Sequence, residues 1–97
     1  MAVAFELYFT DMAQEHYDAL APQKLAKVKK ALRFLKTNPR HPGLNTHEFH
    51  SLENPFEANG KVFVAYVQNQ TPGAYRLFWC YGPNQGQITI LAITPHP

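Results

Sequence analysis

The sequence predicts an α+β fold with the element order β-α-α-β-β-β, in which a helical hairpin packs on one face of a four-stranded, mainly antiparallel sheet. Three observations predict it: an alternating apolar segment near the start, two amphipathic helical segments in the middle, and consecutive apolar strands in the last third. The 97 residues fit a single domain, 1–97, with enough apolar residues for its own core.

The first predicted strand covers Ala2–Thr10, where apolar side chains alternate with small or polar ones. The apolar set is Val3, Phe5, Leu7 and Phe9, and a period of two is typical of a half-buried strand. Asp11 and Gln14 then have the spacing of a capping box, which predicts a helix over Met12–Leu20.

A second helix is predicted over Gln23–Thr37. Its apolar residues recur at spacings of three and four, namely Leu25, Val28, Leu32 and Leu35. Pro22 suits the first turn of this helix because proline needs no backbone donor there. The prolines after Asn38 end the helix, since a residue before proline avoids helical geometry.

A polar loop over Leu44–Gly60 leads to three predicted strands, Lys61–Gln68, Ala74–Trp79 and Ile88–Ile93. The alternation in the second of these divides its side chains between two faces. The more aromatic set, Tyr75, Leu77, Trp79 and Tyr81, is expected to face the helices, which leaves Arg76, Phe78 and Cys80 on the other face. No further helix is available to cover that second face.

Composition narrows the class of protein. The formal net charge is only +2, and the single cysteine, Cys80, excludes an internal disulfide. The start of the chain lacks the pattern of a signal peptide and no segment has membrane-spanning length, so we expect a cytoplasmic protein with no membrane partner. Basic side chains gather on the second predicted helix, which favours a polyanion or an acidic protein as partner, although a solvated helix face explains them almost as well.

Arg76 is a lone charge in the middle of an apolar strand. A buried charge is costly unless it is paired or bound. Two interpretations remain open from the residues: an ion pair or solvated position, and a cation held on a rigid sheet to bind an anion such as phosphate.

Four segments in this order resemble the RelE/ParE toxin superfamily, the toxin halves of bacterial type II toxin–antitoxin modules. They are Lys36–Arg40 after the basic helix, Thr46–Leu52, Ala74–Phe78, and Ile90–His96 at the end of the chain. The resemblance covers nearly the whole length.

The resemblance implies a ribosome-dependent, metal-independent endoribonuclease that cleaves mRNA and inhibits translation, with no cofactor. Its implied partners are a cognate antitoxin, mRNA and the ribosome with its 16S rRNA, and the free protein is a candidate homodimer. ParE-like relatives instead inhibit DNA gyrase, so the alternatives are a non-nucleolytic gyrase inhibitor or a RelE-fold module that only binds protein. The same fold therefore leaves more than one activity open.

The resemblance also implies site residues. Arg76 would bind phosphate and stabilise transition-state charge, while His96 and Tyr66 would complete the catalytic set. His96 is expected to share a face with Ile88, Ile90, Ala92 and Thr94 by alternation. The residues expected to bind RNA or the ribosome are Lys24, Lys27, Lys30, Arg33, Lys61, Phe78 and His50.

Two positions depart from the family pattern. Val64 stands where nuclease members tend to carry lysine or glutamate, and the chain stops at Pro97 without the family's terminal tyrosine. A valine cannot transfer a proton, so another group would have to act as base. His47 and His50 are candidates because their loop can reach the rim of the sheet. We expect no metal site, since no carboxylate or cysteine framework accompanies these histidines, and we expect Cys80 to be a small buried apolar residue.

Overall fold

The computed structural model describes residues 4–68 and 73–95. Its elements are β1 (Glu6–Phe9), α1 (Asp11–Asp18), α2 (Pro22–Thr37), a short 3₁₀ helix η1 (Pro42–Leu44), β2 (His47–Phe49), β3 (Val62–Tyr66), β4 (Tyr75–Tyr81) and β5 (Gln87–Pro95). The strands form one mixed sheet in the order β1-β5-β4-β3-β2, in which only the β1–β5 pairing is parallel. The α+β class and the predicted order of the helices and long strands are therefore confirmed.

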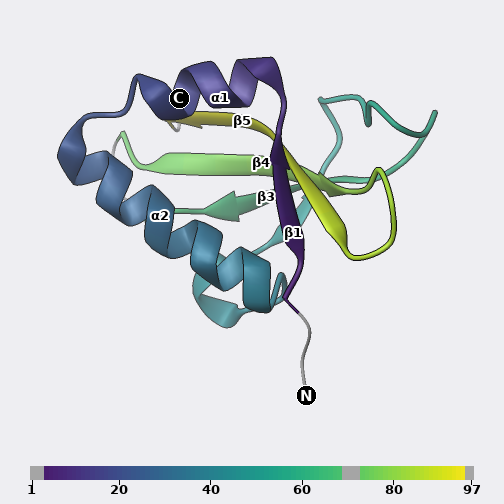
Figure 1. The fold of residues 1–97 in the computed structure, drawn as a ribbon, viewed down its shortest axis with the longest axis horizontal. Coiled ribbons are helices and arrows are strands. Elements are labelled where there is room, and N and C mark those ends of the chain that lie inside the picture. Colours follow the sequence, from purple (N-terminus) through teal and green to yellow (C-terminus); the bar gives the residue numbers. More distant parts are fainter. Residues whose placement is uncertain (1–3, 69–72, 96–97) are drawn as a thin grey trace.

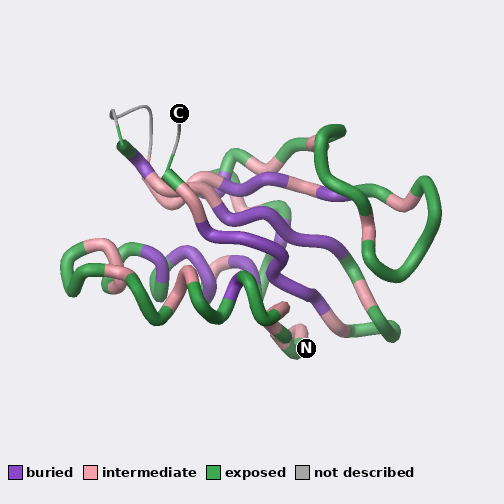
Figure 2. Tube along the Cα trace, turned by 90° about the horizontal axis from the view of Figure 1, so that it is seen from above, coloured by how far each residue is buried: buried purple, intermediate pink, exposed green. Residues whose placement is uncertain are grey.

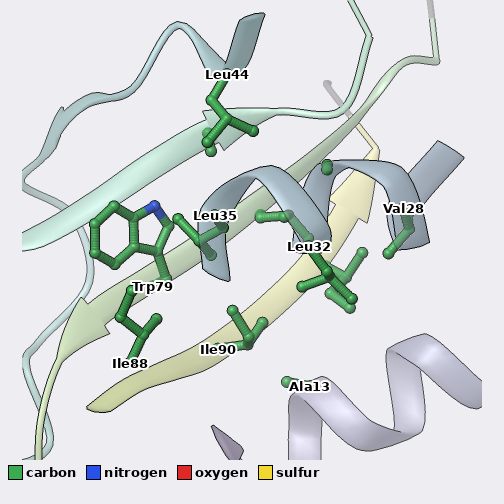
Figure 3. Close-up of a cluster of buried hydrophobic side chains, with 12 residues drawn as sticks. Ala13, Val28, Leu32, Leu35, Leu44, Trp79, Ile88 and Ile90 are labelled. Carbon is green, nitrogen blue, oxygen red and sulfur yellow. The ribbon is translucent and has the colours of Figure 1, made fainter. Parts of the chain in front are cut away.

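Both helices lie against the same face of the sheet, and α2 runs diagonally past the end of β3 (Figure 1). The main core forms between the helices and the sheet, mainly from buried side chains of α2, β4 and β5. Leu44 of η1 packs at one side of this core (Figure 3). Leu77 and Trp79 belong to this core, with Tyr75 packed at its margin. The expectation that this set faces the helices is correct.

The start of α1 differs from the prediction by one residue. Thr10 is the N-cap, and its Oγ1 accepts a hydrogen bond from the backbone N–H of Ala13 at 3.1 Å. Asp11 is instead the first helical residue, where its charge favours the positive end of the helix. The same Thr10 hydroxyl donates to the carbonyl of Leu91 at 3.1 Å, so one side chain joins the helix start to the edge of β5.

The sheet has five strands rather than the four predicted. The additional strand, β2, lies inside the segment expected to be a loop and pairs antiparallel with β3 at the sheet edge. Its three residues are polar or partly exposed, so they lack the alternation of apolar residues that would predict a strand. Backbone pairing with β3 is what makes this segment a strand.

A β-bulge in β5 changes which side chains share a face. Phe78 of β4 pairs with Ala92, but Trp79 pairs with Ile90, so Leu91 is an extra residue. As a result Ile90 lies in the helix-side core while Ala92 lies on the opposite face. The expectation that Ile88, Ile90, Ala92 and Thr94 share one face is therefore wrong. The extra residue interrupts the period of two on which it was based.

The face opposite the helices also carries a small core of its own. Its buried members are Val62, Val64, Phe78, Cys80, Leu91 and Ala92. The loop before β3 reaches this side, and Phe56 packs so closely on Gly82 that a Cβ there would lie 2.9 Å from the Phe56 Cδ2. Figure 2 shows the buried stretches running along the central strands and the inner sides of the helices. The described residues contain no helix long and apolar enough to cross a membrane.

Candidate functional site on the face opposite the helices

Two rows of side chains cross the sheet on the face opposite the helices. Cross-strand partners in β3, β4 and β5 define the first row as Tyr66, Arg76 and Thr94. The second row lies two residues away along each strand and contains His47, Val64, Phe78 and Ala92. Partners in a row share a face of the sheet, so a polar row with one arginine runs beside an apolar row that ends at a histidine.

Arg76 is half-buried, and its guanidinium carbon lies 4.9 Å from the centroid of the Tyr66 ring. A cation over an aromatic ring is attracted by the negative face of that ring. Among the ion pairs of residues 4–68 and 73–95, none involves Arg76. No ion pair of Arg76 is therefore found in the described part of the chain, and the two interpretations that stay open are a partly solvated guanidinium and one that binds an anion.

His47 lies on the other side of the same tyrosine. Its ring meets the Tyr66 ring edge-on, with centroids 5.5 Å apart, and its Cα pairs with that of Val64. The sequence-based expectation that a histidine of this segment reaches the rim of the sheet is met by His47. His47 is thus the cross-strand neighbour of Val64, whose own side chain cannot transfer a proton.

The hydrogen bond of His47 fixes where its proton sits. Nδ1 lies 3.1 Å from the carbonyl oxygen of Asn45, and a carbonyl oxygen can only accept, so Nδ1 carries the hydrogen. In the neutral ring the lone pair is then on Nε2. His47 therefore has the tautomer that a general base at Nε2 requires.

Three lysines of the basic helix lie near the end of β3 that carries Tyr66, but on the helix side of the sheet. Lys24 Nζ donates to Gln68 Oε1 at 3.2 Å and lies 5.8 Å from the Tyr75 ring centroid, so it is held against the sheet. Lys27 and Lys30 line a pocket of about 330 Å³ that also includes Tyr66. Arg33 is exposed on α2 and does not line this pocket.

The remaining predicted binding residues lie at the β2 edge or inside the small core. Lys61 Nζ and His50 Nδ1 approach the Glu48 carboxylate at 3.7 and 3.5 Å, and both side chains are largely exposed. Phe78 is only 8% exposed and meets Phe49 edge-on at a centroid distance of 4.8 Å. Its ring therefore packs in the apolar row, and a base could stack on it only if Phe49 moved.

Three further expectations concern His96, metal binding and Cys80. His96 lies outside the described residues. Within the described part of the chain, no three His, Cys, Asp or Glu side chains gather closely enough to hold a metal ion. Cys80 is fully buried, and burial raises the pKa of its thiol to about 11. The thiol therefore stays protonated at neutral pH, which agrees with its expected role as a small apolar residue.

This arrangement can support phosphodiester chemistry. A guanidinium offers planar N–H donors that match phosphoryl oxygens, an imidazole with a free Nε2 can accept a proton, and nearby lysines attract a polyanion. Arg76 and Tyr66 were predictable from alternation along their strands. The sequence offered His47 as one of two candidate histidines, but its place beside Tyr66 was not predictable because it depends on the register between β2 and β3.

Comparison with known proteins gives structural neighbours only. No family model matches the chain, and no curated protein matches it in sequence. The toxin–antitoxin complex RelBE2 from Mycobacterium tuberculosis matches with 24% identity and a TM-score of 0.62, covering 97% of this chain and 93% of that one. The intact Escherichia coli RelBE complex matches with 14% identity and a TM-score of 0.66, covering 97% and 99%.

A third neighbour is the YoeB/ParE toxin from Agrobacterium tumefaciens. It is 10% identical with a TM-score of 0.67, and the match covers 95% of this chain and 99% of that one. Matches that span nearly the full length of both chains compare the whole fold rather than a fragment. The expected resemblance is therefore confirmed at the level of architecture: this chain has the fold of the RelE/ParE toxins.

Proposed function

We propose that this protein is the toxin of a type II toxin–antitoxin module and cleaves mRNA on the ribosome. The observation that carries the proposal is the Tyr66 ring with Arg76 on one side and His47 on the other. The fold shared with RelE-like toxins favours a toxin function. The fold alone does not distinguish a nuclease from a gyrase inhibitor.

The proposed chemistry uses the ribose 2′-hydroxyl as nucleophile. Its oxygen attacks the adjacent phosphorus as His47 Nε2 takes its proton, and the bond from phosphorus to the 5′-oxygen breaks. The products are a 2′,3′-cyclic phosphate and a free 5′-hydroxyl, which needs one proton at the leaving oxygen. Arg76 stabilises the negative charge that develops on the phosphoryl oxygens. The predicted proton donor is His96.

Each neighbouring group has a defined task in this scheme. Tyr66 orients the Arg76 guanidinium through its ring, and its hydroxyl is available for the RNA backbone. Lys27 and Lys30 hold the strand next to Tyr66 because they line the same pocket. The cognate antitoxin is proposed to restrain the protein, since two of the similar structures are toxin–antitoxin complexes.

The test is induction of the protein in bacteria without an antitoxin, with growth and mRNA 5′ ends followed together. Arg76→Ala is expected to lower cleavage by at least about 100-fold, because one preorganised charge in a site of this kind contributes that much. Arg76→Lys keeps the charge but not the planar donors, so it is expected to restore only part of the activity. Lys29→Ala, an exposed charge on α2, serves as the matched control.

The outcomes separate the alternatives. Growth arrest with new mRNA ends that Arg76→Ala removes supports the ribonuclease. Growth arrest with intact mRNA and inhibited DNA supercoiling would replace it with the ParE-like function. Normal growth at good soluble expression would mean that the fold persists here without toxicity, as a protein-binding module.

A further inference from the structure

A second hollow lies beyond the C-terminal end of α2, on the helix side of the β2 edge. Its volume is about 680 Å³, and its walls are the loop that follows α2 and the beginning of β3. Thr46 Oγ1 donates to the carbonyl of Pro39 at 3.0 Å, which ties the two ends of that loop together. The hollow therefore has a fixed wall.

Aromatic side chains form the floor of this hollow. Phe63 and Trp79 stack with centroids 4.9 Å apart and planes 28° from parallel, and both line the hollow. Tyr81 meets each of them edge-on, at 5.8 and 5.0 Å. Trp79 is 1% exposed, whereas 43% of Tyr81 remains exposed. The floor thus presents the rings of Tyr81 and Phe63, held rigidly by the buried indole.

Two cations stand at the rim. Arg40 and Lys61 both line the hollow and are exposed. Glu48 also lines it and approaches Lys61 at 3.7 Å, which holds that ammonium at the mouth. Arg40 takes part in neither of the ion pairs found among the described residues. The charged side chains of the rim therefore sum to one net positive charge.

An exposed aromatic ring, Tyr81, beneath exposed cations matches the two halves of a nucleotide. Bases stack on aromatic rings regardless of their identity, and cations bind the phosphate that precedes or follows them. A purely apolar peptide side chain would use the rings but make no use of the charge of Arg40, which takes part in neither ion pair of the described residues. Charge complementarity therefore favours an anionic ligand with a planar part.

The hollow lies next to the site on the other face, because one residue, His47, belongs to both. His47 lines the hollow, and its ring contacts Tyr66, which touches Arg76. Because β2 is the edge strand, no further strand separates the hollow from that site. An extended RNA strand bound at Arg76 can pass over this edge and reach the hollow.

We propose that the hollow binds an unpaired nucleotide of the RNA substrate, with its base stacked on the exposed ring of Tyr81 and its phosphate at Arg40 and Lys61. This inference rests on the proposed function, because it takes RNA as the ligand of the Arg76 site. It adds a second contact point, at a distance from the bond that is cleaved, and so makes binding depend on a neighbouring base.

The test measures binding of a fluorescently labelled single-stranded RNA of about six nucleotides to the purified full chain by anisotropy. Tyr81→Leu is expected to weaken binding by about 5- to 160-fold, the range for loss of one stacked base. Tyr81→Phe keeps the ring and is expected to bind like the unmodified protein. Arg40→Ala is expected to weaken binding and to reduce the salt dependence by about one counterion.

Matched controls lie elsewhere on the molecule. Tyr8 is 42% exposed, close to the value for Tyr81, and belongs to β1 at the opposite edge of the sheet. Tyr8→Leu removes an equally exposed ring, and Lys29→Ala removes an exposed charge on α2. Both controls are expected to bind RNA unchanged, and thermal unfolding of every variant checks that the fold is intact.

The result that overturns the proposal is unchanged RNA binding in Tyr81→Leu, whether or not Arg40→Ala weakens it, because general attraction of a polyanion needs no ring. Unchanged RNA binding together with weakened antitoxin binding would assign the hollow to a protein partner instead. Loss of mRNA cleavage in Arg76→Ala tests the proposed function separately. If Tyr81→Leu cleaves mRNA at the normal rate and at the same positions, the proposed function stands and only the nucleotide-binding role of the hollow is rejected.

Discussion

The two faces of the sheet are built on different principles. The helix-side face is closed by α1 and α2 over an uninterrupted apolar core. The opposite face has only a small apolar cluster, and one end of it turns polar at Tyr66, Arg76 and Thr94. The same three strands supply both faces, because successive side chains of a strand point to opposite sides.

This difference separates stability from chemistry. Groups on the second face are positioned by backbones that the first face holds in place, and catalytic groups on rigid strands keep their geometry. Changes on the helix side should therefore affect folding, and changes in the polar row should affect activity. Three predictions test how far this separation holds.

Leu35→Ala is expected to have the largest effect on stability. Leu35 is fully buried in the helix-side core, so its truncation should lower the free energy of unfolding by about 3 kcal/mol. Arg76→Ala should change that free energy by less than about 1 kcal/mol, because the arginine is only half-buried. Urea denaturation of both variants measures the contrast, and equal losses would show that the two faces are not energetically separate.

His47→Gln sharpens the contrast within the second face. A glutamine amide can still donate to the Asn45 carbonyl but has no basic nitrogen, so cleavage by the bound protein should slow by about 100-fold. His50→Gln should instead weaken ribosome or RNA binding and leave the rate of the bound complex alone. Single-turnover cleavage at saturating protein distinguishes the two, and an unchanged rate in His47→Gln would remove it as the base.

Cys80 gives the smallest expected effect. Its thiol pKa is raised by burial to about 11 from an ordinary 9.0. The folded state therefore resists ionisation, and the stability contributed by the neutral thiol is complete below the unfolded pKa and lost as pH rises toward the folded one. Between about pH 8 and about pH 10 the unfolding free energy should fall by about 1 kcal/mol more than in Cys80→Ala. If the unfolding free energies of the unmodified protein and of Cys80→Ala changed equally with pH, the pKa of the thiol would not be raised in the folded state.

Local pattern in the sequence determined the helices, the long strands and, in β3 and β4, the division of side chains between the faces. The amphipathic period of α2 and the alternation in β4 depend on residues that are neighbours in the chain. For that reason the sequence placed Leu77 and Trp79 with the helices and Arg76 on the opposite face. These assignments need no knowledge of distant contacts.

Only the tertiary structure decided the features that depend on pairing between distant segments. The strand β2 exists because β3 offers it backbone partners, and that register brings His47 opposite Val64. The bulge at Leu91 adjusts β5 to β4 and reverses the alternation that the sequence implies. The loop before β3 folds back so that Phe56 packs on Gly82. Each is set by hydrogen bonds and packing between residues far apart in the chain, which a local pattern does not encode.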